Sequence, residues 1–186
     1  EAMKEAVERG INTTGVLPGT LKYPRKASNF YRKARNNHSR GGFLGRIFAY
    51  TLAVSEENGG GGKVVTAPTC GACGGVPGLL YALREEYELQ EDEILKSLAI
   101  AGLIGNLIKE NATISGAEGG CQAEVGSACS MAAAMACFLL GGSLAQIEYA
   151  AEMALEHHLG LTCDPVGGYV QVPCIERNAA AAARAL

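Results

Sequence analysis

The chain has 186 residues, 48% of them hydrophobic and 19% charged, which suffices for one domain with a sizeable core and argues against disorder. Its formal net charge is -3 and no Lys/Arg run alternates with aromatic residues, which argues against a nucleic-acid surface. The longest apolar run, 128–140, is shorter than the roughly 20 residues that a membrane span needs.

Seven cysteines accompany a first segment, EAMKEAVERG, that lacks the pattern of a signal peptide. We therefore expect a reducing compartment, the cytoplasm, where thiols serve metal binding or catalysis more often than disulfides. Because the sequence opens without Met, we also expect it to be part of a longer chain.

The first half of the chain predicts helices over 1–9, closed by Gly10, and over 43–57, ended by Asn58 and the glycines 59–62. Polar residues and the segments LPGT and YPRK predict a loop between them. KVVTAP, 63–68, is a candidate for a short buried strand. Pro77 is expected to start a further helix that ends near Tyr87.

The second half alternates helices with glycine loops. Apolar residues at helical spacing predict a helix over 92–110, and the stretch 127–140, apolar on every side, predicts a central buried helix. Ser143 and Gln146 form a capping-box pattern for a helix to His158 that closes at Gly160. A last alanine-rich helix follows Pro173. These patterns predict a mostly helical, all-α fold.

Four glycine- or proline-containing loops carry reactive residues, namely 66–78 (TAPTCGACGGVPG), 111–121 (NATISGAEGGC), 160–168 (GLTCDPVGG) and 173–178 (PCIERN). Glycine permits left-handed backbone and close approach to a ligand. If the four loops meet at helix ends, they surround one site.

The seven cysteines fall into three groups. Cys129 and Cys137 lie in the predicted buried helix and read as small core residues. Cys70 and Cys73 form a C-x-x-C that fits a redox pair or half of a zinc site, although no second pair follows. The remaining three, Cys121, Cys163 and Cys174, each adjoin glycine or proline.

Soft thiolates select iron–sulfur clusters, zinc or copper(I), and three of them leave one metal position open for a substrate. The separations of 42 and 11 residues match no common ferredoxin spacing, so spacing alone leaves the metal undecided.

The segments APTCGACG, NATISGAEGGCQAEVGSACSMAAA and EHHLGLTCDPVGGYVQVPCIERNA closely resemble the iron–sulfur-dependent L-serine dehydratases, specifically their α-chain or catalytic domain. The resemblance runs from about GINTTGVLPG to the last residue. It implies an all-helical catalytic domain over 1–186 and a [4Fe-4S] cluster held by Cys121, Cys163 and Cys174, with no pyridoxal phosphate.

The same resemblance implies a lyase of serine catabolism and gluconeogenesis that converts L-serine to pyruvate and ammonia. Family members also have a regulatory β domain or chain, which these 186 residues lack, and we expect an oligomer. Many carry Asn in place of Cys70 and of His158, and some carry a C-terminal cysteine that caps the cluster and is absent here.

Removal of water from serine requires help for a poor leaving group and a base for a weakly acidic α-proton. An iron without a protein thiolate can bind the 3-hydroxyl as a Lewis acid. His157, which matches the family's histidine in E-H-x-L-G-L, is the first candidate base, with Lys109 and Glu118 after it. Each of them has an alternative reading, for His157 a capping residue and for Glu118 an acceptor for loop amides.

Substrate contacts are expected from the loops. Backbone amides and hydroxyls there can form a nest for the substrate carboxylate, and Arg177 can pair with it or else support the turn at Cys174. The expected substrate-binding residues are Thr69, Cys70, Gly71, Asn111, Ser115, Gly116, Arg177 and Asn178. Two alternatives stay open: a desulfidase that acts on L-cysteine, and a non-catalytic zinc or thiol module built on Cys70 and Cys73.

Overall fold

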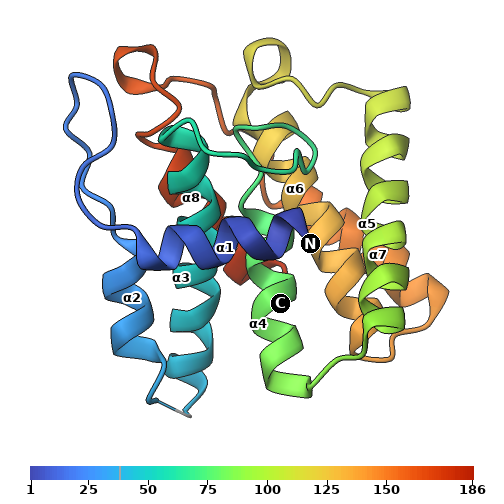
Figure 1. Ribbon diagram of the computed structural model, residues 1–186. Helices are drawn as coiled ribbons and strands as arrows, with labels where there is room; N and C mark the ends of the chain where they lie inside the picture. Colours follow the sequence, from blue (N-terminus) through green and yellow to red (C-terminus); the bar gives the residue numbers. More distant parts are fainter. Residues whose placement is uncertain (38) are drawn as a thin grey trace.

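The computed structural model describes residues 1–37 and 39–186, and the fold is all-α, as predicted (Figure 1). Within the described residues there is no β-sheet, and one isolated bridge pairs Val16 with Pro24. The helices are α1 (Ala2–Asn12), α2 (Ala27–Ala34), α3 (Arg40–Gly59), α4 (Gly75–Tyr87), α5 (Glu91–Asn111), α6 (Gly116–Leu139), α7 (Leu144–Glu156), the short 3-10 turn η1 (Val166–Gly168) and α8 (Cys174–Arg184).

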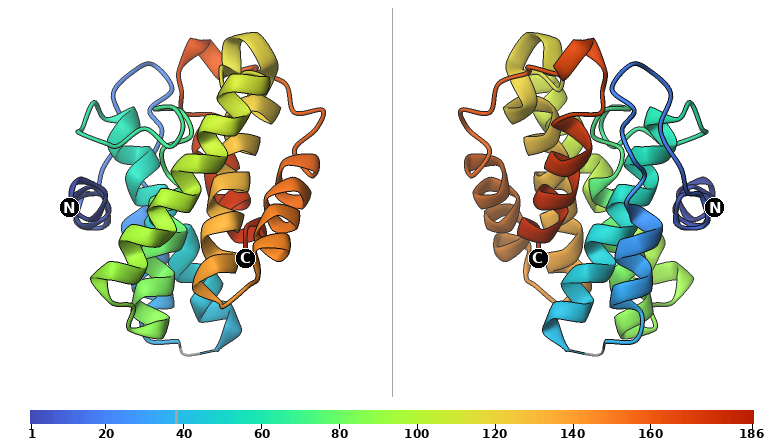
Figure 2. Two further views of the ribbon diagram at one scale, coloured as in Figure 1. Left: turned by 90° about the vertical axis from the view of Figure 1, so that its right-hand side faces the viewer. Right: turned by 90° about the vertical axis from the view of Figure 1, so that its left-hand side faces the viewer.

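Two long helices organise the molecule. α3 packs against α1, α2, α4 and α8, whereas α6 packs against α4, α5, α7 and α8. Helices α4 and α8 therefore connect the two halves, and Figure 2 shows this arrangement from two sides. Long connections between α3 and α4 and between α7 and α8 carry glycine-containing segments to the helix ends.

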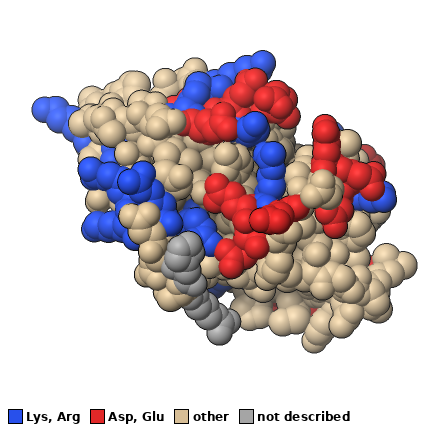
Figure 3. Space-filling view, turned by 60° about the horizontal axis from the view of Figure 1, so that its bottom comes forward, with Lys and Arg blue, Asp and Glu red and all other residues tan. Residues whose placement is uncertain are grey.

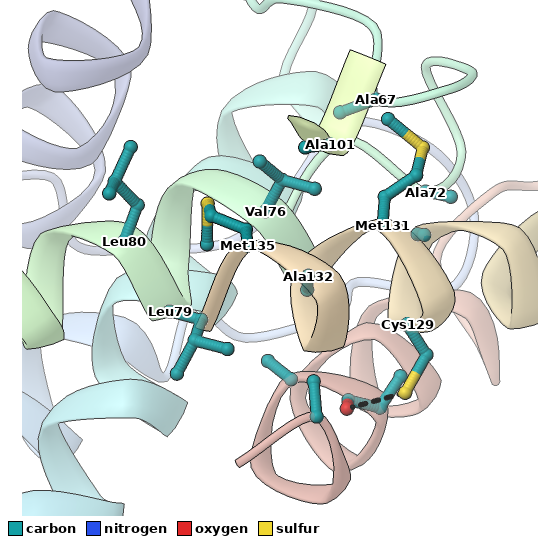
Figure 4. Close-up of a cluster of buried hydrophobic side chains, with 14 of the residues drawn as sticks. Ala67, Ala72, Val76, Leu79, Leu80, Ala101, Cys129, Met131, Ala132 and Met135 are labelled. Carbon is teal, nitrogen blue, oxygen red and sulfur yellow. Dashed lines mark hydrogen bonds between the residues drawn. The ribbon is translucent and has the colours of Figure 1, made fainter. Parts of the chain in front are cut away.

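The main core lies where α6 meets α4 and α8, and it confirms the predicted central buried helix. Met131, Ala132 and Met135 of α6 lie beside Val76 and Leu79 of α4 (Figure 4). Cys129 points to the other side of α6, is fully buried, and its thiol donates to the carbonyl of Ala181 at 3.2 Å. Burial raises the pKa of Cys129 to about 12, so this thiol is a neutral core residue as expected.

Helix α2 was expected to be loop, and that prediction is wrong. The first backbone amides of this helix donate to a buried carboxylate of α3: Lys26 N and Ala27 N lie 2.6 Å and 3.2 Å from Glu56 Oε1. These contacts satisfy amides that the helix itself leaves unpaired. The cap comes from a residue about 30 positions away, so the local sequence around 27–34 gives no sign of it.

Gly10 lies inside α1 instead of ending it, which corrects the predicted boundary. A Cβ atom at this position would lie 2.3–2.6 Å from the backbone of Ala53, so glycine is required for α1 to cross α3 closely. The other boundaries shift less: α4 begins two residues before Pro77, α7 ends at Glu156, and residues 63–68 form irregular loop instead of a strand. The capping box of Ser143 and Gln146 is confirmed.

Helix length and surface charge bear on the expected partners. Among residues 1–37 and 39–186, no helix is both long enough and apolar enough to cross a membrane.

Figure 3 shows one end of the molecule, where acidic and basic side chains lie next to one another. Arg46 and Glu86 form an ion pair between α3 and α4.

His158 makes the unfolding free energy depend on pH. The side chain is 3% exposed and Nδ1 donates to the Ala154 carbonyl at 2.8 Å. Burial lowers its pKa, and the positive charges of Arg184 and His157 lower it further. Since the unfolded chain binds the proton more readily, stability is full above about pH 6.5 and falls as the pH drops below it.

We expect His158→Asn to remove this part of the pH dependence. Urea unfolding of wild type and variant between pH 5 and 8.5, under reducing conditions, measures it. The unfolding free energy of wild type minus that of the variant should change by up to about 1.4 kcal/mol per pH unit below pH 6.5. Above pH 6.5 this difference should stay constant. A constant difference across the whole range would contradict this assignment.

Candidate functional site

Three of the four glycine- or proline-containing loops, namely 111–121, 160–168 and 173–178, gather at the upper end of the molecule as drawn in Figures 1 and 2, where α6 starts and the segment after α7 passes. Cys121 lies near the start of α6, Cys163 in the segment after α7, and Cys174 is the first residue of α8. Segments that are separate in the sequence thus bring the three predicted cluster ligands to one region.

The electrostatics of the thiols show that they share one site. Burial raises the pKa of Cys174 to about 11, and the negative charges of Cys121, Glu124 and Cys163 raise it further. The pKa of Cys163 is also raised, by loss of solvation and then by Cys121, Glu124 and Asp164. The thiolates of Cys163 and Cys174 are therefore disfavoured by neighbouring negative charge, and a bound cationic group would relieve this repulsion.

A kink in α6 positions Cys121. Gly120 has φ 80° and ψ 179°, a conformation open in practice only to glycine, and it interrupts the helix just before the cysteine. The amide of Gln122 donates to the carbonyl of Leu161 at 3.0 Å, and the amide of Gly160 donates to Gln122 Oε1 at 2.9 Å. The kink thereby docks the segment that carries Cys163 onto the start of α6.

Arg177 joins two of the thiol-bearing segments. Its Nη1 donates to Thr162 O at 2.8 Å and to Cys121 Sγ at 3.1 Å, while Nη2 lies 3.4 Å from Asp164 Oδ1. The guanidinium of Arg177 thus holds the Cys121 sulfur and the carbonyl of Thr162 beside one another. The structure places this predicted carboxylate-binding residue against the thiol site itself.

Asn178 fastens the 66–78 loop to α8. The side chain is 1% exposed; Oδ1 accepts from Gly74 N at 3.2 Å, and Nδ2 donates to the carbonyls of Gly71 and Cys174 at 2.8 Å and 2.9 Å. The structure therefore gives this predicted substrate contact three hydrogen bonds within the protein. Through Asn178 the 66–78 loop lies beside the first turn of α8.

Glu124 is the functional candidate that the sequence reasoning missed. It lies one turn after Cys121 on α6, and Thr69 Oγ1 donates to its Oε1 at 2.5 Å. A Cβ atom at Gly71 would lie 2.5 Å from Oε1, and one at Gly116 would collide with Oε2. Three predicted site residues thus surround this carboxylate. The spacing C-x-x-E, which puts both side chains on one helix face, was the available signal.

Ser115 and Glu118 belong to the start of α6. Ser115 Oγ accepts from the amide of Glu118 at 3.3 Å and so caps the helix. Glu118 Oε2 accepts from Thr113 Oγ1 at 2.7 Å, and the side chain is exposed. Both residues therefore stabilise the turn that leads to Gly120 and Cys121.

Three predicted residues are exposed at helix ends. Lys109 and Asn111 are exposed at the end of α5, where Asn111 Nδ2 donates to Leu107 O at 2.8 Å. His157 is exposed, and its carbonyl accepts from Arg184 at 3.1 Å. Arg184 is the last residue of α8, about 15 Å along the helix from Cys174.

Cys70 and Cys73 differ in accessibility. Cys70 is exposed, whereas Cys73 is 1% exposed in the main core. Burial raises the pKa of Cys73 to about 12, and the neighbouring Cys70 raises it further. Of this pair, Cys73 therefore packs in the core, whereas Cys70 is open to solvent in the loop.

The donor set of Cys121, Cys163 and Cys174 fits a thiolate-bound metal group, because thiolates are the ligands that iron–sulfur clusters, zinc and copper(I) share. An arginine is hydrogen-bonded to one of the three sulfurs. In the part of the chain that the structure describes, no three His, Cys, Asp or Glu side chains are close enough to hold one metal ion together.

Comparison with known proteins gives a consistent result. The sequence model of the family described as "Serine dehydratase alpha chain" matches residues 1–186. The chain is 53% identical over 186 residues to an L-serine dehydratase of Streptomyces coelicolor, which covers 99% of this chain and 41% of the relative. It is 52% identical over 192 residues to that of Haemophilus influenzae and 52% over 191 residues to L-serine dehydratase 2 of Escherichia coli, in each case over 100% of this chain and 42% of the relative. The chain thus spans about two fifths of the length of these relatives.

Proposed function

Because this chain belongs to the serine dehydratase alpha chain family, we propose that it is the catalytic domain of an iron–sulfur L-serine dehydratase, which converts L-serine to pyruvate and ammonia. Residues 1–186 form that one domain. A β domain or chain accounts for the further length of the relatives, and the whole protein works as an oligomer. Seven free thiols suit the reducing cytoplasm.

The convergence of Cys121, Cys163 and Cys174 is the observation that carries this proposal. Together they would hold a [4Fe-4S] cluster, with Arg177 hydrogen-bonded to the Cys121 sulfur. When bound, the cluster supplies a Lewis acid for the departing 3-hydroxyl, and no pyridoxal phosphate is required. The protein contributes the ligands, a cation beside them and loops around the site.

The loops orient the substrate in this proposal. Amides of the 66–78 loop and of the turn at Ser115 and Gly116 are the proposed donors to the substrate carboxylate. Thr69 takes part through Glu124, because its hydroxyl donates to that residue and accepts from Ala72 N at 3.2 Å. Cys70, exposed in the same loop, remains a proposed neighbour of the substrate.

The proposal has three candidates for the base that removes the α-proton. Of these, Glu118 belongs to the segment that leads into Cys121. His157 and Lys109 lie at the ends of α7 and α5. Glu118 is accordingly the first of the three to test, by the pH dependence of kcat in Glu118→Gln.

Anaerobic reconstitution with iron and sulfide tests the function. We expect about four irons and four sulfides per chain, visible charge-transfer absorption, and pyruvate release from L-serine by the intact protein. L-cysteine serves as the competing substrate. Faster release of pyruvate from cysteine than from serine would overturn the dehydratase assignment in favour of a desulfidase, and absence of bound iron would overturn the cofactor.

A further inference from the structure

Within residues 1–37 and 39–186, the Glu124 carboxylate has no cationic partner. Among residues 1–37 and 39–186, no Lys, Arg or His forms an ion pair with it, and its one hydrogen-bond donor in this part of the chain is the neutral hydroxyl of Thr69. The arginine of the site, Arg177, is used by Cys121, Thr162 and Asp164. A half-buried carboxylate without a counter-charge is costly unless a ligand supplies one.

The surroundings of Glu124 add negative charge instead of balancing it. Glu124 lies one turn after Cys121 on α6, the helix that carries one of the proposed cluster ligands. When the site's three thiols bind metal as thiolates, this carboxylate remains an additional anion near them. An ammonium group that entered the site would meet a carboxylate there.

The loops are shaped around this carboxylate. Thr69 fixes Oε1, and the absence of side chains at Gly71 and Gly116 lets two loops approach the two carboxylate oxygens. Oε2 receives no hydrogen bond from the residues that the structure describes. The carboxylate is thus held in one orientation, with one oxygen left for a ligand.

We infer that Glu124 binds the α-ammonium group of the amino-acid substrate and so selects amino acids over hydroxy acids. This inference rests on the proposed function and adds a recognition residue to it. L-serine would approach with its ammonium at Oε2 and its hydroxyl toward the thiol-bound metal. An analogue with a hydroxyl in place of the ammonium would leave the carboxylate unpaired.

A pair of unreactive ligands tests this selectivity. L-alanine and L-lactate differ only in the ammonium or hydroxyl at Cα, and neither can lose water as serine does. Equilibrium dialysis of the labelled ligands against the intact, cluster-loaded protein under anaerobic conditions measures binding without turnover. We expect wild type to bind L-alanine about 10- to 100-fold more tightly than L-lactate, as a charge-assisted hydrogen bond would produce.

Glu124→Gln should bring that ratio close to one while the iron content stays at the wild-type value. The matched control is Glu152→Gln, the same change at an exposed position of α7, which should keep the ratio. An unchanged ratio in Glu124→Gln would overturn the inference, even if turnover fell. So would a wild-type protein that binds both ligands equally.

If Glu124→Gln does not retain iron, Glu124→Asp is measured instead. It keeps the charge but withdraws it by one methylene, so L-alanine binding should weaken at least about fivefold while L-lactate binding is unchanged. Equal weakening of both ligands would indicate a structural role and overturn the inference. Failure of the proposed function is separate, since it would appear as a wild-type protein without pyruvate release from L-serine.

Discussion

Replacement of Cys121, Cys163 and Cys174 by serine in one variant is expected to abolish iron binding and to lower pyruvate formation at least ~10³-fold. The estimate follows because Lewis-acid stabilisation is worth several kcal/mol, and each 1.36 kcal/mol corresponds to a factor of ten in rate. The charges of Cys121 and Cys163 raise the pKa of Cys174, so the three thiols lie near one another. Iron and sulfide analysis after anaerobic reconstitution, followed by a pyruvate assay, measures both effects.

The control for this variant removes the other loop thiols, Cys70 and Cys73. Their double serine variant should keep its iron, because Cys73 is a core residue whose sulfur lies 3.9 Å from the Val54 carbonyl. Circular dichroism checks that the buried hydroxyl has not unfolded it. Iron that is lost from this control and retained in the triple variant would mean that the ligands are wrongly assigned.

Gly120→Ala is expected to lower the unfolding free energy by about 2–4 kcal/mol and to prevent cluster binding. Two costs add here. The left-handed φ of 80° is strained for alanine, and the new Cβ would lie 2.6 Å from the Leu161 carbonyl. Relief of that collision must separate α6 from the segment before Cys163. Urea unfolding and iron analysis measure the two results.

Gly141→Ala provides the comparison for this prediction. Gly141 also has a positive φ, 82°, but no atom lies within 4 Å of the position that a Cβ would take. We expect a cost of about 1 kcal/mol and normal iron content. Equal stability losses in the two variants, with iron retained in both, would show that the kink at Gly120 does not position Cys121.

The helices were predictable where their patterns are local. The capping box at Ser143 and the apolar stretch of α6 identified real elements. α2 was not predictable, because the carboxylate that caps it belongs to Glu56 on another helix. Gly10 was read as a stop signal, whereas it serves the crossing of α1 over α3. In both cases a tertiary contact decided the local structure.

The site residues, too, were predictable where their signal is local. The cysteines next to glycine and proline indicated loops that meet in the structure, and the charges of Cys121 and Cys163 raise the pKa of Cys174. Glu124 was missed because it follows the loop, inside a helix where acidic residues are ordinary. Its significance comes from Gly71 and Gly116, which approach it from two other segments. Single-sequence patterns carry no information on such approaches.

The local attachment of the segment that bears Cys163 has a consequence for damage by oxygen. Cys121 and the helix α8 belong to the main core, whereas the Cys163 segment attaches to them through Gln122 and Arg177. Loss of a cluster would release these local contacts and leave the helical core folded. Air-inactivated protein would then be a substrate for repair, since the ligands need only be reduced and reloaded without refolding of the chain.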